Sequence, residues 1–334
     1  MGLSDELYSM AEFLQTSESD ELLSKVRLEQ KIQQKQHTIL AGPPGTGKTK
    51  LVMDLKETLQ KNQNLGVFDF IQFHREFSYQ DFIEGYKPSS NGGFVPKRGV
   101  FRKFISKVEK RLQNPSFQGG DSEVIDLFVI DEINRANISS VFGELFTLLE
   151  DSERKSIRLP RSNQELQLFD SVVIVGTMNT ADKSIALLDF ALRRRFAYLF
   201  VPPDYEGLKS WLLRYGLAFN DFSIDEYVQS VQALNQRITK HPLLGKGMML
   251  GQALFVPRRI KGSYEPFTLE EIAERFVEQV FPQLEAYFGF GGQRELDNII
   301  SPDLRIKIEQ AKAIQTADIV GFIRILSKEN HIES

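Results

Sequence analysis

Residues 42–49 read GPPGTGKT and match the phosphate-binding pattern G-x-x-x-x-G-K-[ST] at every fixed position. The apolar stretch HTILA precedes this loop and the amphipathic stretch KLVMDLKETLQ follows it, so the loop joins a strand to a helix. Glycines let backbone N–H groups approach phosphate oxygens, and the helix directs its positive end toward them. Lys48 is expected to neutralise the β- and γ-phosphates and Thr49 to ligate Mg²⁺. The predicted nucleotide ligands are Gly42, Pro43, Pro44, Gly45, Thr46, Gly47, Lys48 and Thr49.

An acidic pair ends a second apolar strand. Residues 127–137 read LFVIDEINRAN, so Asp131 and Glu132 emerge where the strand finishes, the edge at which open α/β sheets bind ligands. Phosphoryl transfer depends mainly on positioning and charge compensation. We therefore expect Asp131 to hold Mg²⁺ together with Thr49, and Glu132 to orient and deprotonate the attacking water.

The stretch GTMNTADKSIALLDFALRRRF, residues 176–196, begins with the end of another strand. Asn179 closes that strand, and its amide is predicted to sense the γ-phosphate or the attacking water. The alternative for Asn179 is an ordinary turn asparagine. Asp182 or Ser184 is expected to cap the helix that follows.

Three arginines end the same helix. Cations at a helix C-terminus are stabilised by the helix dipole, which is a sufficient structural role. Consecutive helical residues point about 100° apart, so the three cannot share one task. We expect Arg194 and Arg195 to act as arginine fingers on a neighbouring subunit's nucleotide, and Arg193 to be structural.

Apolar strands alternate with helices as far as Pro202-Pro203, which predicts an α/β fold with a parallel five-stranded core sheet flanked by helices. Two hairpins, at residues 91–104 and 155–169, interrupt this alternation. After the double proline the chain is mainly helical, and residues 247–257, GMMLGQALFVP, form its one strand-like piece. The predicted division is a lead-in helix at 1–35, an α/β nucleotide-binding domain at 36–203 and a helical lid domain at 204–334.

Composition excludes several function classes. The formal net charge of -4 does not indicate a nucleic-acid binder that acts through bulk positive charge. The chain has no cysteine, which excludes disulfides, thiolate catalysis and zinc–cysteine sites. No apolar run approaches the roughly 20 residues that span a bilayer. We expect a soluble, cytoplasmic protein with no membrane partner.

Taken together, GPPGTGKT, DEINRAN, MNTADKS and ALRRRF resemble the AAA+ motor domain of the McrB family, the nucleotide-hydrolysing subunit of McrBC modification-dependent restriction systems. The resemblance covers about residues 36–290 and includes FSYQDFIEGYKP, LGKGMMLGQALF and FPQLEAYF. The phosphate loop alone is generic, whereas DEINRAN combined with MNTAD is close to diagnostic.

The resemblance implies a hexameric ring that prefers GTP over ATP and is stimulated by an McrC-like nuclease subunit inserted into the ring. MNTAD is linked in the family to guanine nucleotide use, and this carries over to Asn179, Thr180 and Asp182. Arg194 and Arg195 match the family's finger positions.

Three departures qualify this picture. Lys183 stands where the family often has arginine, and Gln252 in LGQALF takes the histidine position of the usual I-G-H-S-Y-F. Family members usually carry an N-terminal DNA-reading domain, but about 35 residues precede the motor here. Contact with DNA is therefore expected to be indirect, or through another domain or subunit.

Two rival functions fit parts of the same pattern. A MoxR-like ATPase that remodels proteins shares the motor, although MNTAD argues against it. A nucleotide-binding scaffold that hydrolyses little is the other, and the intact Glu132 argues against that one.

Overall fold

The computed structural model describes residues 20–90, 92–114, 124–150, 156–182, 194–257, 265–289, 291–309 and 316–329. The chain forms two compact units. We call Ser24–Ala41 with Lys48–Phe200 the sheet unit. We call Met1–Leu23, Gly42–Gly47 and Val201–Ser334 together the helical unit. The phosphate-loop segment at 42–47 thus belongs to the same unit as the C-terminal helices. Lys183, Ser184 and Arg193 lie outside the described residues.

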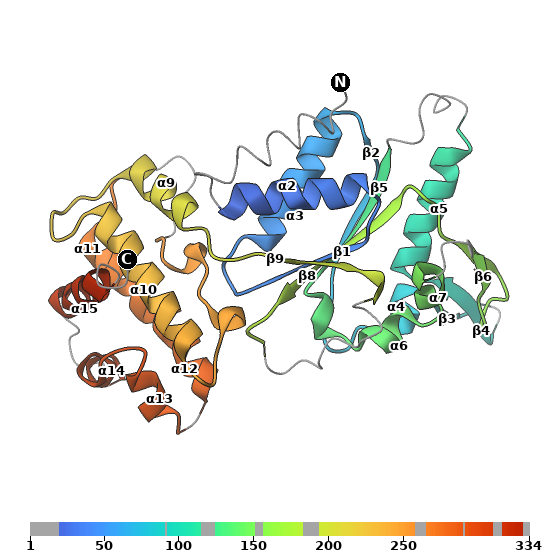
Figure 1. Ribbon diagram of the computed structural model, residues 1–334. Coiled ribbons are helices and arrows are strands. Elements are labelled where there is room, and N and C mark those ends of the chain that lie inside the picture. Colours follow the sequence, from blue (N-terminus) through green and yellow to red (C-terminus); the bar gives the residue numbers. More distant parts are fainter. Residues whose placement is uncertain are drawn as a thin grey trace. The chain divides into compact units, whose positions relative to one another are not determined.

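The sheet unit is built on five strands in the order β2-β5-β8-β1-β9. The pairings β2 with β5, β5 with β8 and β1 with β9 are parallel (Figure 1). β8 therefore lies between β5 and β1, although it follows both in sequence. The predicted parallel five-stranded sheet is confirmed. The strands are β1 (Thr38–Gly42), β2 (Leu65–Gln72), β5 (Ile125–Asp131), β8 (Val172–Asn179) and β9 (Ala197–Phe200).

The central strands are mostly apolar because both faces of the sheet are covered, with Asp126 in β5 and Thr177 in β8 as buried polar exceptions. Residues 125–130 of β5 and 172–178 of β8 are buried without a break. Helices flank the sheet, and α3 packs against β2, β5 and β8 (Figure 1). Gly143, with φ of 50°, separates two short helices that follow β5. The helices of this unit are α2 (Asp20–Gln33), α3 (Lys48–Lys61), α4 (Tyr79–Phe82), α5 (Val100–Leu112), α6 (Ile138–Phe142) and α7 (Leu145–Glu150), with the 3-10 turn η2 (Ile133–Arg135).

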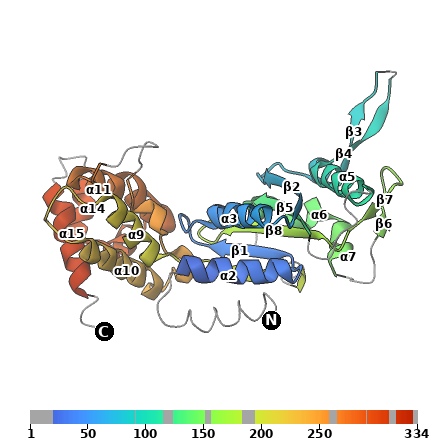
Figure 2. The ribbon, with the colours of Figure 1, turned by 90° about the horizontal axis from the view of Figure 1, so that it is seen from above.

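Two antiparallel hairpins extend the sheet unit. The first joins β3 (Glu84–Pro88) to β4 (Phe94–Arg98), and Figure 2 shows it projecting away from the main sheet. The second joins β6 (Ser156–Arg158) to β7 (Glu165–Gln167). The sequence predicted the second hairpin at 155–169, where it lies. It placed the first at 91–104, whereas this hairpin begins at Glu84 and residues 100–104 belong to α5.

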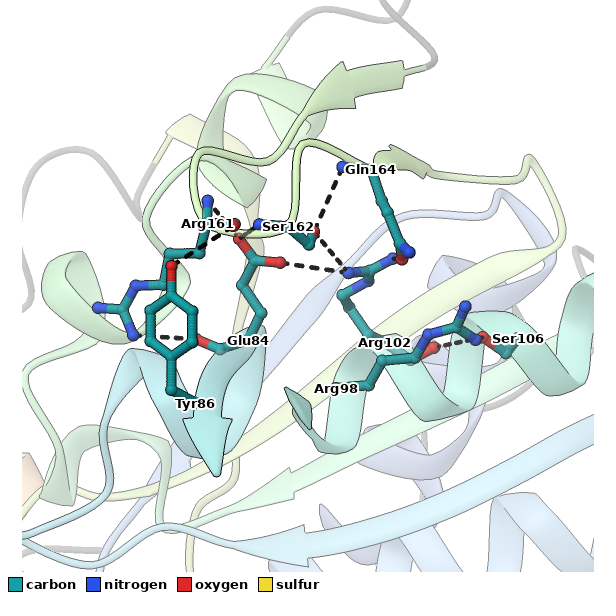
Figure 3. Close-up of polar contacts among 8 residues, drawn as sticks. All are labelled: Glu84, Tyr86, Arg98, Arg102, Ser106, Arg161, Ser162 and Gln164. Carbon is teal, nitrogen blue, oxygen red and sulfur yellow. Dashed lines mark hydrogen bonds and ion pairs between the residues drawn. The ribbon is translucent and has the colours of Figure 1, made fainter. Parts of the chain in front are cut away.

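A buried carboxylate connects the two hairpins. Glu84, fully buried at the start of β3, pairs with Arg102 of α5 across 3.3 Å (Figure 3). The backbone N–H groups of Arg161 and Ser162, in the turn between β6 and β7, donate to the other oxygen of Glu84 at 2.9 and 3.2 Å. A buried carboxylate requires such partners, so Glu84 fixes the base of the first hairpin to the tip of the second.

Helices make up most of the helical unit, in agreement with the prediction for this region. α10 packs against both α9 and α15, and a capping box of Ser223 and Glu226 starts it. The expected strand-like piece at 247–257 is wrong, because it forms two 3-10 turns. The elements are α9 (Tyr205–Tyr215), α10 (Ile224–Lys240), η3 (Lys246–Met248), η4 (Gln252–Leu254), α11 (Leu269–Arg275), the π-helical η5 (Phe276–Val280), α12 (Phe281–Phe288), α13 (Gln293–Asp297), α14 (Pro302–Glu309) and α15 (Thr316–Glu329). Among the described residues, no helix combines the length and hydropathy that crossing a membrane requires.

Candidate functional site

The phosphate-loop segment depends on two glycines in left-handed conformations. Gly45 has φ of 78° and Gly47 has φ of 84°. Residues that carry a Cβ rarely adopt such backbone angles. Between them, Thr46 is buried, and its Oγ1 donates to the carbonyl of Pro43 at 3.1 Å. The spacing of glycine in GPPGTGKT therefore follows from the turn that the backbone makes here.

Lys48 and Thr49 begin α3 in the sheet unit. Burial lowers the pKa of the Lys48 amine to about 8, and the carboxylates of Glu132 and Asp131 act in the opposite direction. Two acidic side chains from the end of β5 thus act electrostatically on the lysine that follows the loop. A half-buried lysine whose pKa is lowered by desolvation and raised by two nearby carboxylates is a candidate for a functional site.

Asp131 receives two hydroxyl hydrogen bonds on one oxygen. Thr49 Oγ1 donates to Asp131 Oδ1 at 3.0 Å, and Thr177 Oγ1 donates to the same atom at 2.6 Å. Thr49 comes from α3, Asp131 from β5 and Thr177 from β8. Because the strands are parallel, their carboxyl ends meet at one edge of the sheet, and this edge collects all three side chains.

These residues fit a magnesium ion. Neighbouring ligands of octahedral Mg²⁺, with bonds of about 2.0–2.1 Å, stand about 2.9 Å apart. Thr49 Oγ1 and Asp131 Oδ1 are separated by 3.0 Å. Among the residues that the structure describes, no group of three or more His, Asp or Glu side chains could hold a metal. Such a pair is nevertheless typical for Mg²⁺, which keeps several waters and takes substrate phosphates as ligands.

Glu132 follows Asp131 in a left-handed conformation, with φ of 54°. A non-glycine residue rarely occupies this region, and such strain concentrates at functional sites. Its N–H donates to Thr177 Oγ1 at 3.1 Å, and its carboxylate accepts from Arg135 Nε at 3.3 Å. The left-handed residue follows directly after the last residue of β5, Asp131.

Asn179 ends β8, the strand between β5 and β1. Its Oδ1 accepts the N–H of Ala181 at 3.1 Å, a turn that uses only the acceptor end of the amide. The donor end, Nδ2, suits a phosphate oxygen or a water. The backbone carbonyl of Asn179 accepts from Asn134 Nδ2 at 3.2 Å.

The two arginines that the structure describes at 193–195 differ in their surroundings. Arg195 is half-buried, donates from Nε to the carbonyl of Phe146 at 3.0 Å, and lies over the Phe146 ring at 4.9 Å. Arg194 is exposed. Thr180 and Asp182 are half-buried just beyond β8.

Sequence reasoning missed two of the polar residues at this edge. Thr177 precedes Asn179 by two positions, so strand alternation places both on one face, and this signal was available in GTMN. Asn134 belongs to DEINRAN, but nothing in the pattern indicated that its amide would hold the carbonyl of Asn179.

One family model and two curated proteins are similar to this chain. Residues 37–196 match the model of the AAA domain, dynein-related subfamily. The type IV methyl-directed restriction enzyme EcoKMcrB subunit of Escherichia coli K12 is 36% identical over 264 residues, which are 76% of this chain and 54% of that protein. The type II restriction enzyme BsuMI component YdiS of Bacillus subtilis 168 is 28% identical over 211 residues, 52% of this chain and 60% of that protein.

The chain thus spans little more than half the length of the curated relatives it matches. The solved structure of a candidate ATPase from Cytophaga hutchinsonii is 17% identical, with a TM-score of 0.35. The match covers 90% of this chain and 87% of that chain. That likeness is too weak to support an argument.

A parallel sheet with a glycine phosphate loop after its first strand and an acidic pair at the end of a neighbouring strand defines a P-loop nucleoside triphosphate hydrolase of the AAA+ class. Within that class, the chain carries an AAA+ domain of the McrB family.

Proposed function

We propose that this protein hydrolyses the γ-phosphate of a nucleoside triphosphate, with GTP preferred over ATP, and that the hydrolysis drives or switches an McrC-like nuclease in a restriction system. The observation that carries the proposal is the meeting of Thr49, Asp131 and Thr177 at one edge of the sheet. This arrangement supports Mg²⁺ binding beside Glu132, the acidic residue that follows Asp131.

Each residue has a role in the proposed reaction. Lys48 neutralises charge on the β- and γ-phosphates, and Thr49 and Asp131 hold Mg²⁺, which compensates charge on the phosphates when bound. Glu132 orients the attacking water and accepts its proton. Asn179 donates its Nδ2 hydrogens to the γ-phosphate or that water. The water oxygen forms the new bond to phosphorus as the bond to the β-phosphate oxygen breaks, so the products are a nucleoside diphosphate and phosphate.

The guanine preference rests on the MNTAD sequence at 178–182, in which Thr180 and Asp182 follow the sensor position. The role in restriction is supported by the two relatives, a subunit of one restriction enzyme and a component of another. Contact with DNA is proposed to be indirect, or through another domain or subunit, as the family resemblance implies.

We also propose that the chain assembles into a ring, hexameric as the family resemblance implies, in which Arg194 completes a neighbour's site. Its exposure favours it over Arg195, whose guanidinium is engaged with Phe146 of the same chain. An arginine finger in trans is worth about 10³–10⁵ in rate in other systems.

Phosphate release from GTP and from ATP by the purified protein, with and without an McrC-like subunit, tests the restriction assignment. We expect a higher kcat/KM for GTP and stimulation by that subunit. Strict ATP use without any response to the subunit would instead favour a protein-remodelling ATPase of the MoxR type. Nucleotide-dependent ring assembly with negligible turnover in both conditions would favour a scaffold.

A further inference from the structure

A turn in the helical unit lies against the carbonyl side of the phosphate loop. The N–H of Gly251 donates to the carbonyl of Pro44 at 2.9 Å, and the N–H of Ala253 donates to the carbonyl of Gly45 at 3.1 Å. The side chain of Gln252 adds a third bond, from Nε2 to the carbonyl of Thr46 at 3.2 Å. The turn therefore binds three successive carbonyls of the loop.

The consequence for the loop follows from peptide geometry. In a planar trans peptide the N–H points opposite to the carbonyl. The carbonyls of residues 44, 45 and 46 face the turn, so the N–H groups of the next residue in each case face away from it. The N–H groups of Gly45, Thr46 and Gly47 are therefore directed to one side, as in the backbone concavities that bind anions.

The approach is close enough to require glycine in the turn. A Cβ on Gly251 would stand 2.1 Å from the carbonyl carbon of Gly45 and 2.3 Å from the nitrogen of Thr46. No substituent fits at such distances, so Gly251 allows backbone to lie directly on backbone. The side chain of Leu254 also lies beside the loop, with its Cγ 3.0 Å from where a Gly45 Cβ would be.

Gln252 uses both ends of its amide. While Nε2 donates to the loop, Oε1 accepts the N–H of Asp204 at 3.0 Å. Asp204 is the N-cap of α9, where its Oδ1 accepts the N–H of Gly207. One side chain therefore joins the phosphate loop to the first helix of the helical unit.

The turn itself is anchored to α10 at both ends. Asn235 Nδ2 donates to the carbonyl of Leu250 at 2.9 Å, and the N–H of Leu250 donates back to Asn235 Oδ1 at 2.7 Å. At the other end, the hydroxyl of Tyr227 donates to the carbonyl of Phe255 at 2.9 Å. Asn235 and Tyr227 are buried, so the turn has a rigid support.

We propose that the turn at residues 250–255, with Gln252 near its centre, is a brace that holds the phosphate loop in its phosphate-binding conformation. Gln252 is a positioning residue, because it contacts the loop's carbonyl side and acts on phosphate through the loop. This proposal rests on the proposed nucleotide binding. The brace is the part of the fold that preorganises the loop for that binding.

The test compares Gln252→Glu and Gln252→Ala with wild type. Glutamate keeps the acceptor for the N–H of Asp204 and the side-chain volume, but it places an acceptor against the carbonyl of Thr46. Alanine removes both bonds. Gln232→Glu is the matched control, because Gln232 of α10 is also half-buried in the helical unit and makes no side-chain hydrogen bond to the loop.

The first measurement is equilibrium binding of fluorescent GTP and GDP analogues to the full chain with Mg²⁺. We expect the dissociation constants of both nucleotides to rise about tenfold or more in Gln252→Glu and Gln252→Ala, by similar factors, since the loop binds phosphates and not the base. Turnover at saturating nucleotide should change much less than KM. Unchanged dissociation constants in both variants, with Gln232→Glu behaving as wild type, would overturn the brace.

The second measurement needs no nucleotide. Amide hydrogen exchange of peptides that cover residues 42–50 should be about tenfold faster in Gln252→Ala than in wild type, while peptides from α10 stay unchanged. Equal exchange in the loop peptides would also overturn the brace. If wild type bound neither nucleotide, the proposed function would fail while this second measurement still decided the brace. Should Gln252→Ala fold poorly, Gln252→Glu supplies the same exchange comparison.

Discussion

Thr177 donates a hydrogen bond from Oγ1 to Oδ1 of Asp131 across 2.6 Å. The same hydroxyl oxygen accepts the N–H of Glu132 at 3.1 Å. A single buried hydroxyl on β8 thus orients the carboxylate proposed to hold Mg²⁺ and fixes the backbone of the residue proposed to orient water. Since Glu132 has an unfavourable left-handed conformation, this contact compensates part of its strain.

Replacing Thr177 tests that relationship. Thr177→Val preserves shape but leaves the N–H of Glu132 without its acceptor, which typically costs about 1–3 kcal/mol. We expect turnover to fall at least tenfold and the Mg²⁺ concentration for half-maximal activity to rise. Thr177→Ser keeps the hydroxyl and should retain most activity. Equal activity of the valine and serine variants would show that the hydroxyl has no part in the reaction.

The pKa of Lys48, lowered by burial to about 8, predicts a pH dependence of binding. A bound polyphosphate stabilises the charged amine and raises its pKa above that of the free protein, so binding takes up a proton once the free amine is neutral. The dissociation constant should therefore increase as the pH rises from about 7.5 to 9.5, approaching tenfold per unit above pH 8. Fluorescent-nucleotide titrations at each pH measure this.

Lys48→Arg provides the control, because a guanidinium stays protonated throughout that range. Its affinity will differ from wild type but should not vary with pH between 7.5 and 9.5. A wild-type affinity that is constant over the same range contradicts the assignment of Lys48 to the phosphates.

Alanine substitutions of Arg194 and of Arg195 should have different effects on stability and turnover. Arg195→Ala removes the hydrogen bond to the Phe146 carbonyl and the contact with its ring, so we expect the free energy of unfolding to fall by about 1–3 kcal/mol. Arg194→Ala removes an exposed side chain and should leave stability within about 0.5 kcal/mol while turnover falls strongly. Urea unfolding and phosphate release measure the two quantities.

Mixed assemblies show whether Arg194 acts on a neighbour. Chains with Arg194→Ala and chains with Lys48→Ala are each expected to be inactive alone. In a random equimolar ring, about a quarter of the interfaces pair an intact site with an intact arginine. Turnover should therefore rise toward about a quarter of the wild-type value. Mixed rings confirmed by mass that recover no turnover would exclude a finger in trans.

Glu84 is expected to be a stability determinant of the sheet unit. Glu84→Ala leaves the buried Arg102 without its carboxylate, and the N–H groups of Arg161 and Ser162 lose their acceptor. Breaking a buried pair by removing one partner typically costs about 3–5 kcal/mol. Glu57→Ala, on the exposed side of α3, is the control and should change the free energy of unfolding by less than about 0.5 kcal/mol in urea titrations.

The sequence predicted those parts of the protein whose signals are local. GPPGTGKT stands between a strand and a helix, and the continuous apolar runs that end in Asp131 and Asn179 are typical of central parallel strands. The observed strand order places β8, which ends at Asn179, between β5 and β1.

The features that could not be predicted depend on partners distant in sequence. Residues 247–257 are apolar enough to suggest a strand, yet their N–H groups bind Asn235 and the phosphate loop, and Gln252 bonds across 206 residues to Thr46. The different environments of Arg194 and Arg195 were equally inaccessible, because they depend on where Phe146 packs.

Phosphate release by wild type and by Glu132→Gln, measured at saturating GTP and Mg²⁺, tests the central claim most directly. Glutamine preserves the shape of Glu132 but cannot accept the proton of the attacking water. We predict that Glu132→Gln binds GTP with a dissociation constant within about threefold of wild type and that its turnover falls at least 100-fold. Turnover equal to that of wild type would contradict the proposed role of Glu132, and failure of wild type to bind either nucleotide would contradict the account as a whole.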